Sequence, residues 1–232
     1  MDRLSLRLSL CSCLCLALIA GALGPSRAFA GGSDFWSELA YPGQRRYLQE
    51  LQRGKKLEAQ ADEYFRRRSS PVLVRRLRED ALGAYERALK ARPGGGEALH
   101  RKARLMLDLG KFKAALPIVR SARQKNTRAR WDKDLAFMMG VAHSKLGVFR
   151  KSVDEYDRYE QICNRYQRCQ RYGRATAHAN AAEALMALGR LDEAILRYRL
   201  ALSYQGGMAL SHWGLGVALD LQDVGQVEPI AG

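Results

Sequence analysis

The sequence lacks the motifs that most enzymes and metal proteins carry. Its 232 residues contain no GxSxG elbow, no HExxH helix, no phosphate-binding glycine loop and no CxxC pair. Prolines number only six, whereas alanine, leucine and arginine recur along the whole chain, which favours helices over strands. We therefore expect an all-α protein that is not an enzyme and that uses no metal and no cofactor.

Long apolar runs are also missing, except for one at the N-terminus. Arg3 and Arg7 precede an apolar run over residues 8–24, and Ala28-Phe29-Ala30 comes after it. This order is typical of a secretory signal, so residues 1–30 are expected to be removed on export, with the periplasm as destination. An uncleaved membrane anchor is the alternative, because the run is near the lower limit for spanning about 30 Å of hydrocarbon. A lipid anchor would need a better placed cysteine.

Cysteines are scarce beyond this segment. Three of the five lie within it, which leaves Cys163 and Cys169. In an oxidising compartment these two could form a disulfide. Because a continuous helix would place residues six apart on different sides, the bond requires a bend between them. The pair is interpreted as a local staple or as two free thiols.

Three segments repeat the same turn, and the residues after each turn repeat a pattern as well. The turns are Leu109-Gly110-Lys111-Phe112, Leu146-Gly147-Val148-Phe149 and Leu188-Gly189-Arg190-Leu191. A small and then a larger residue come after each of them: Ala115 and Val119, Ser152 and Tyr156, Ala194 and Tyr198. A glycine after the last helical residue supplies the left-handed conformation that ends a helix. Each segment is thus predicted to be a helix, a tight turn and a second helix.

These residues resemble the tetratricopeptide repeat family, whose unit of about 34 residues is a pair of antiparallel helices. The resemblance implies an all-α fold, a right-handed superhelical stack of such pairs. It divides the chain into a lead-in over residues 31–61, repeats over 62–221 and an irregular tail over 222–232. The units would begin near Asp62, Gly96, Lys133, Ala175 and Ala209.

The first and last units depart from the pattern. The first has three arginines, two serines and a proline over residues 66–71, where a close helix crossing is expected. We interpret Ser70 as an N-cap and Pro71 as the first residue of a lengthened helix, preceded by a helix from about Gln44 to Arg68. The last unit has one helix only, and its apolar residues need a cover. That cover could be the tail, a partner or a second copy of the chain in a homodimer.

In this family the first helix of each unit lines a concave groove that holds a peptide or a helix. The resemblance places ten residues there: His100, Arg104, Asp108, Phe137, Val141, Lys145, Glu183, Met186, Trp213 and Val217. Such a groove would be basic at one end and apolar at the other. His100 is the candidate functional histidine, because the other three occupy packing positions.

The net charge of +15 predicts an attraction to nucleic acid, anionic lipid or acidic polypeptides, and export makes nucleic acid the least suited of these. Two basic surfaces stand out: Arg66, Arg67, Arg68, Arg75, Arg76 and Arg78, and then Arg165, Arg168 and Arg171. Two main functions stay open, besides an accessory subunit of a secretion or envelope enzyme complex. One is an exported scaffold whose groove holds a protein or peptide, which could be acidic. The other is an envelope protein that grips an anionic glycan or lipid through its arginines.

Overall fold

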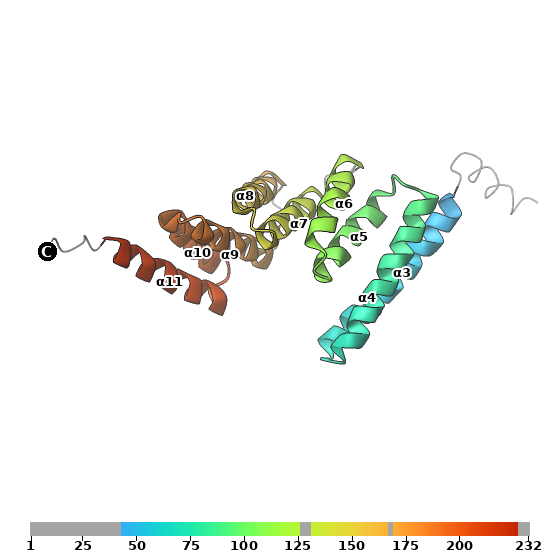
Figure 1. Cartoon of the computed structure of the whole chain (residues 1–232), viewed down its shortest axis with the longest axis horizontal. Coiled ribbons are helices and arrows are strands. Elements are labelled where there is room, and N and C mark those ends of the chain that lie inside the picture. Colours follow the sequence, from blue (N-terminus) through green and yellow to red (C-terminus); the bar gives the residue numbers. More distant parts are fainter. Residues whose placement is uncertain (1–42, 126–130, 167–168, 227–232) are drawn as a thin grey trace, which may run out of the picture. The chain divides into compact units, whose positions relative to one another are not determined.

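The computed structural model describes residues 43–125, 131–166 and 169–226, and these form nine α-helices without a strand (Figure 1). The chain divides into two compact units, residues 1–45 and 46–232. Of the first unit, only the turn at Gly43 and the start of the first described helix are described. The predicted signal peptide and residues 31–42 of the predicted lead-in therefore lie outside the described residues. The expected all-α fold is confirmed.

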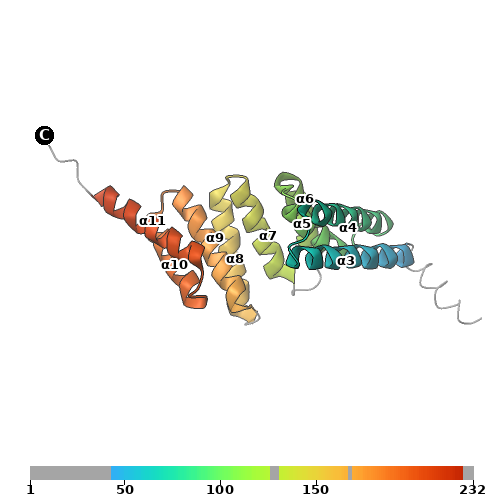
Figure 2. The same cartoon turned by 90° about the horizontal axis from the view of Figure 1, so that it is seen from below.

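The helices are arranged in successive pairs (Figure 2). Their bounds are α3 Gln44–Arg66, α4 Pro71–Ala91, α5 Gly96–Asp108, α6 Phe112–Lys125, α7 Asp132–Lys145, α8 Phe149–Tyr166, α9 Arg171–Ala187, α10 Leu191–Tyr204 and α11 Ala209–Gln226. From α4 on, each helix contacts the next, and α7 also contacts α5 and α9, while α9 contacts α11. The first helices of successive units thus form one layer, as in a repeat solenoid.

The predicted glycine-ended helices are present in all three repeated turns. Gly110, Gly147 and Gly189 have φ of +73°, +73° and +71°, the left-handed conformation that glycine adopts without strain. The residue after each glycine donates its N–H to a carbonyl near the end of the preceding helix: Lys111 to Met106, Val148 to His143 and Arg190 to Leu185, at 2.8, 2.9 and 3.0 Å. These bonds satisfy carbonyls that the helix end would leave free.

The turn between α3 and α4 is built differently. Its left-handed residue is Arg68, with φ of 52°. The N–H of Ser69 donates to the carbonyl of Tyr64 at 3.0 Å, the same kind of closing bond as in the glycine turns. α3 ends at Arg66, slightly earlier than expected, and Pro71 begins α4 as expected. Ser70 occupies the N-cap position, but its side chain makes no capping hydrogen bond.

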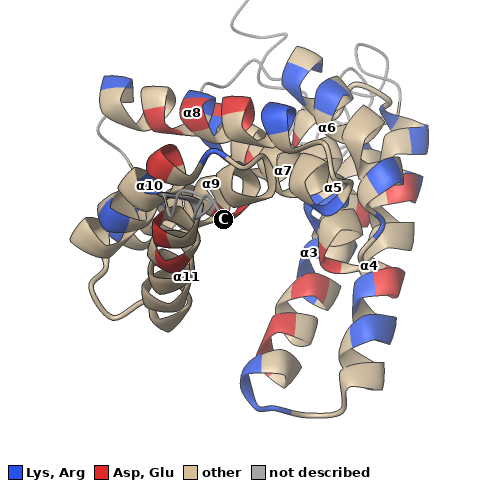
Figure 3. Ribbon diagram, turned by 60° about the vertical axis from the view of Figure 1, so that its left-hand side comes forward, with Lys and Arg blue, Asp and Glu red and all other residues tan. Residues whose placement is uncertain are grey.

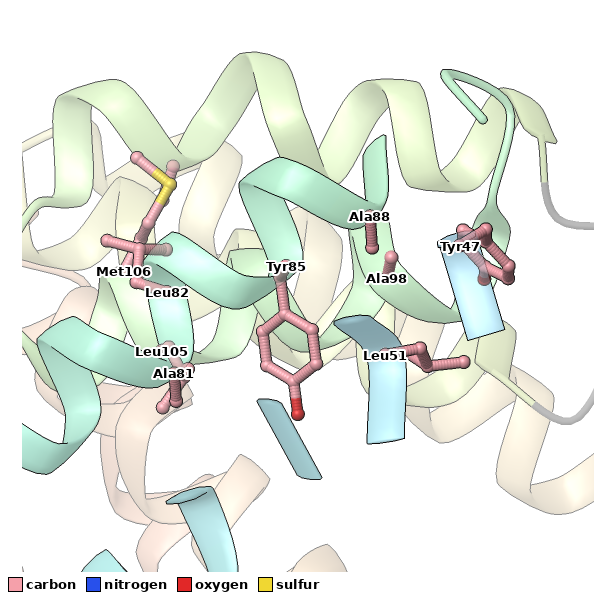
Figure 4. Close-up of a cluster of buried hydrophobic side chains, with 10 residues drawn as sticks. Tyr47, Leu51, Ala81, Leu82, Tyr85, Ala88, Ala98, Leu105 and Met106 are labelled. Carbon is pink, nitrogen blue, oxygen red and sulfur yellow. The ribbon is translucent and has the colours of Figure 1, made fainter. Parts of the chain in front are cut away.

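A glycine that faces a tyrosine recurs in the core. A Cβ atom at Gly54 would lie 2.5 Å from the Tyr85 ring, and one at Gly140 would lie 2.8 Å from the ring of Tyr156. Gly214 and Tyr198 repeat the arrangement on α11. Figure 4 shows Tyr85 among small and aliphatic side chains of the first core cluster. The missing side chain of each glycine lets a large ring fill the space between helices.

The closing helix is longer than expected and keeps an apolar surface. The sequence placed its end at Leu221, whereas α11 continues to Gln226. Trp213 is 71% exposed, and Leu210 and Val224 are also exposed. Of the predicted tail, residues 222–226 belong to α11 and residues 227–232 lie outside the described part of the chain, so the cover stays a prediction. None of the described helices is both long and apolar enough to traverse a bilayer.

Candidate functional site

An open groove of about 570 Å³ lies where α5, α7 and the start of α9 meet. Its lining contains five of the ten residues that the sequence placed in a groove: His100, Arg104, Asp108, Phe137 and Val141. These come from two successive first helices, so residues far apart in the chain share one surface. The structure brings this half of the predicted set together.

The other five residues do not line this groove. Lys145 and Glu183 are exposed, and Val217 is half-buried. Met186 packs against the buried cluster that joins α9, α10 and α11. Trp213 is exposed on α11.

Sequence reasoning missed seven of the twelve residues that line the groove. Besides the predicted residues, the groove is lined by Leu107, Lys133, Asp134, Met138, Tyr159, Gln170 and Gly173. Tyr159 lies on α8, a second helix, and Gln170 lies in the insertion before α9. Gly173 admits the Tyr159 hydroxyl, since a Cβ atom there would lie 2.7 Å from it. That contact depends on how two helices meet, so no local signal indicates it.

The apolar side of the groove is held rigidly. The ring of Phe137 meets the rings of Tyr156 and Tyr159 edge-on, each with centroids 5.6 Å apart. Burial raises the pKa of Tyr159, and the negative charges of Asp134 and Glu160 raise it further. Its hydroxyl therefore stays protonated and can donate a hydrogen bond.

His100 lies between an aromatic ring and a carboxylate. Its ring stacks on Trp131 with centroids 5.4 Å apart, and its Nε2 lies 3.7 Å from the Asp134 Oδ2. Within the described residues the buried Nε2 has no hydrogen-bond partner. A ligand group that reaches this nitrogen would satisfy it.

A buried carboxylate positions the basic side of the groove. Glu58 on α3 is only 3% exposed. Its Oε2 accepts hydrogen bonds from the Tyr85 hydroxyl at 2.7 Å and from the Arg101 Nη1 at 2.9 Å. Its Oε1 pairs with the Nη2 of Arg104, whose side chain stays partly exposed at the groove. The guanidinium of Arg104 is thus held in place by a helix that does not line the groove.

No protein-family model matches the sequence, and a search of curated proteins finds no match. Solved structures do match. A structure of MamA is 20% identical, with 63% of this chain and 80% of that one covered and a TM-score of 0.55. MamA from Desulfovibrio magneticus RS-1 is 15% identical, with 73% and 85% covered and a TM-score of 0.55. YrrB, described as a TPR protein with an unusual peptide-binding site, is 19% identical, with 63% and 70% covered and a TM-score of 0.52.

The helices have the tetratricopeptide repeat fold. In this chain the groove is lined mainly by the first helices α5 and α7. At such low identity the likeness concerns the fold, and the chemistry of the site has to come from this chain's own residues. Among the described residues, no three histidine, cysteine or carboxylate side chains are placed to hold a metal ion.

A second cavity, of about 650 Å³, lies at the turn between α3 and α4 in the first tetratricopeptide hairpin. Four of the six arginines of the first basic surface line it: Arg66, Arg68, Arg75 and Arg78. Asp108 lines this cavity and the groove alike, so the two adjoin. Burial raises the pKa of Asp108, although Arg78 and Arg104 act in the opposite direction.

The remaining arginines of that surface are elsewhere. Arg67 forms an ion pair with Glu63 at 2.5 Å, and Arg76 is exposed outside the cavity.

The arginines of the second basic surface differ in their surroundings. Arg171 donates hydrogen bonds to the carbonyls of Ser203 and Tyr204 at the end of α10, at 3.4 and 3.3 Å. Arg165 is exposed, with its guanidinium over the ring of a neighbouring tyrosine, and Arg168 lies outside the described residues. A disulfide joins Cys163 and Cys169, whose Cα atoms are 5.3 Å apart, across the bend between α8 and α9.

Proposed function

We propose that this chain is an exported scaffold, without catalysis of its own, that holds an extended segment of a partner protein in the groove between α5 and α7. The observation that carries the proposal is the lining itself. Apolar Phe137, Met138 and Val141 lie beside polar and charged groups from the neighbouring first helix. A few precisely placed polar groups around an apolar surface are typical of ligand sites of this volume.

The groove is suited to binding because it is already formed. Aromatic neighbours hold Phe137 in place, and the Glu58 carboxylate holds Arg104. A ligand therefore orders few side chains on binding, which lowers the entropic cost. The peptide-binding site named for YrrB supports the same use of the fold.

A substitution in the groove tests this proposal. Peptides selected from a random library against the exported chain should bind wild type, and Val141→Asp should weaken them about tenfold or more because it introduces a charge into an apolar contact. Leu196→Asp is the matched control, since Leu196 is 58% exposed on α10 and outside the groove. Thermal unfolding verifies that both variants fold. If the selected peptides bound both variants with the same affinity as wild type, binding in the groove would be refuted.

Export is a separate part of the proposal and rests on residues 1–30. We expect the chain to be recovered from the periplasm with Gly31 as its first residue, as intact-mass measurement would show. A chain that keeps its apolar run and sediments with membranes would instead indicate the anchor.

The arginine cavity favours a second candidate, an envelope protein that grips an anionic glycan or lipid. Salt separates the two functions. A peptide bound to the groove alone through apolar contacts should survive moderately raised ionic strength, whereas binding of the arginines to a glycan or lipid should weaken steeply.

A further inference from the structure

The turn between α3 and α4 carries an arginine where the rest of the stack carries glycine. Arg68 has φ of 52°, and the corresponding residues Gly110, Gly147 and Gly189 have φ of 71–73°. A side chain in this conformation is strained, so glycine would be the more stable choice at position 68. The side chain of Arg68 lines the cavity at this turn. The strain is explained if that side chain has a function.

The cavity holds more positive than negative charge. Arg78 lies 4.0 Å from Asp62, and Arg75 lies 3.3 Å from Glu79. Within the described residues, neither Arg66 nor Arg68 forms an ion pair, and the buried Nε of Arg78 has no hydrogen-bond partner. Figure 3 shows the basic residues of this turn. Guanidinium groups in this arrangement are suited to carboxylates, which they bind through paired N–H donors.

The walls of the cavity are apolar. Phe65 is 64% exposed, and it lines the cavity with Pro71, Val74 and Leu109. A glycan can stack on the Phe65 ring but has no side chains to place against Pro71, Val74 and Leu109. A peptide that alternates acidic and apolar side chains would use both the walls and the arginines.

The cavity also adjoins the groove. Asp108 lines both, and its neighbours Leu107 and Leu109 line the groove and the cavity respectively. One extended chain can therefore occupy the two sites in succession. This adjacency favours a peptide over a membrane surface, which would meet only the outer side of the turn.

We propose that the cavity lined by Phe65, Arg66, Arg68, Arg75 and Arg78 binds an acidic stretch of the partner segment that occupies the groove. The link between the two sites rests on the proposed function of the groove. Asp108, at the junction, repels carboxylates and so sets the register: acidic residues lie on the arginines, and apolar residues lie on Phe137 and Val141.

The acidic site is tested first by itself, with fluorescent hexaglutamate on the exported chain and hexaglutamine as the uncharged probe. We expect hexaglutamate alone to bind, Arg68→Gly and Arg75→Gln each to weaken it about tenfold, and Asp108→Asn to strengthen it. Arg68→Gly should unfold at the same temperature as wild type or higher, so lost binding cannot be ascribed to lost folding. Arg165→Gln is the matched control, because it removes the same charge from an exposed site elsewhere.

Three results would overturn the proposal. The first is no binding of hexaglutamate, and the second is an equal loss of hexaglutamate affinity in Arg68→Gly and Arg165→Gln. The third is an Arg68-dependent binding of phosphatidylglycerol vesicles or dextran sulfate with which hexaglutamate does not compete. The first two exclude a built acidic site, and the third indicates an envelope surface instead.

The link to the groove is tested with a library-selected groove peptide extended by glutamates. It should bind wild type at least about tenfold more tightly than either part, and should lose this gain in both Arg68→Gly and Val141→Asp. If hexaglutamate binds and no groove peptide does, the groove fails while the arginine site stands. If both bind and the extended peptide gains nothing, the link alone is refuted.

Discussion

In the helix pairs from α5 to α10, the residue that ends the first helix is a glycine in the left-handed conformation, whereas in the α3–α4 hairpin it is Arg68. The cores differ as well. The hairpin buries the charged Glu58 against Tyr85, while the α7–α8 pair buries Ser152, whose hydroxyl donates to the Gly140 carbonyl at 2.9 Å. In the regular helix pairs, each turn has the residue that its backbone conformation favours, and no Asp, Glu, Lys or Arg side chain of their described residues is buried. Where a rule is broken, the residue that breaks it lies beside a cavity, as expected of sites selected for function.

The largest effect is expected at Glu58. Glu58→Ala leaves the Tyr85 hydroxyl and the Arg101 guanidinium without their buried acceptor, and should lower the free energy of unfolding by about 3 kcal/mol. Ser152→Ala removes one hydrogen bond from the regular pair and should cost about 1 kcal/mol. Urea unfolding followed by circular dichroism measures both losses. Equal losses would show that the hairpin does not depend on its buried charge.

The glycine–tyrosine contacts should behave alike in both regions. Gly54→Ala in the hairpin and Gly140→Ala in α7 each place a methyl group within 3 Å of a buried tyrosine ring. We expect about 2 kcal/mol of destabilisation from each, because the rings have little room to move. Gly83→Ala is the control, since its nearest neighbour would be 3.5 Å away at the end of an arginine side chain. A loss confined to one region would mean that the tyrosine in the other region can yield.

The disulfide stabilises the connection between α8 and α9, which belongs to the regular region. Reduction of the bond between Cys163 and Cys169, or Cys163→Ser with Cys169→Ser, should cost about 2 kcal/mol, because the bond closes a short loop in the unfolded chain. The groove lies nearby, with Gln170 and Gly173 in its lining. We therefore expect weaker binding of groove peptides after reduction and no change in hexaglutamate binding at the α3–α4 turn. Thermal melts with and without a reductant, and then both titrations, measure this.

The same comparison bears on which features could be predicted from the sequence, although the starts of α3 and α4 in the hairpin were predicted as well. The turn glycines and the small-then-large pairs are local signals, so the helices from α5 to α10 and five groove residues on α5 and α7 were predictable. No local sequence pattern indicates the buried interactions of Glu58, because its partners are 27, 43 and 46 residues further along the chain. The conformation of Arg68 was hidden for a similar reason. An arginine at a helix end indicates a solvated side chain, and its positive φ arises only from the way the hairpin closes.

The smallest effect, and the most direct test of the comparison, is an exchange at the turns. Arg68→Gly relieves a strained backbone and should raise the free energy of unfolding by about 1 kcal/mol, while Gly147→Ala introduces the same strain into the α7–α8 turn and should lower it by about as much. No atom lies within 4 Å of a Cβ at Gly147, so packing does not disturb the comparison. Thermal unfolding of the two variants shows whether each change raises or lowers the stability. If Arg68→Gly destabilised the chain, the arginine would be stabilising its own turn, and a role in ligand binding would no longer be needed to explain it.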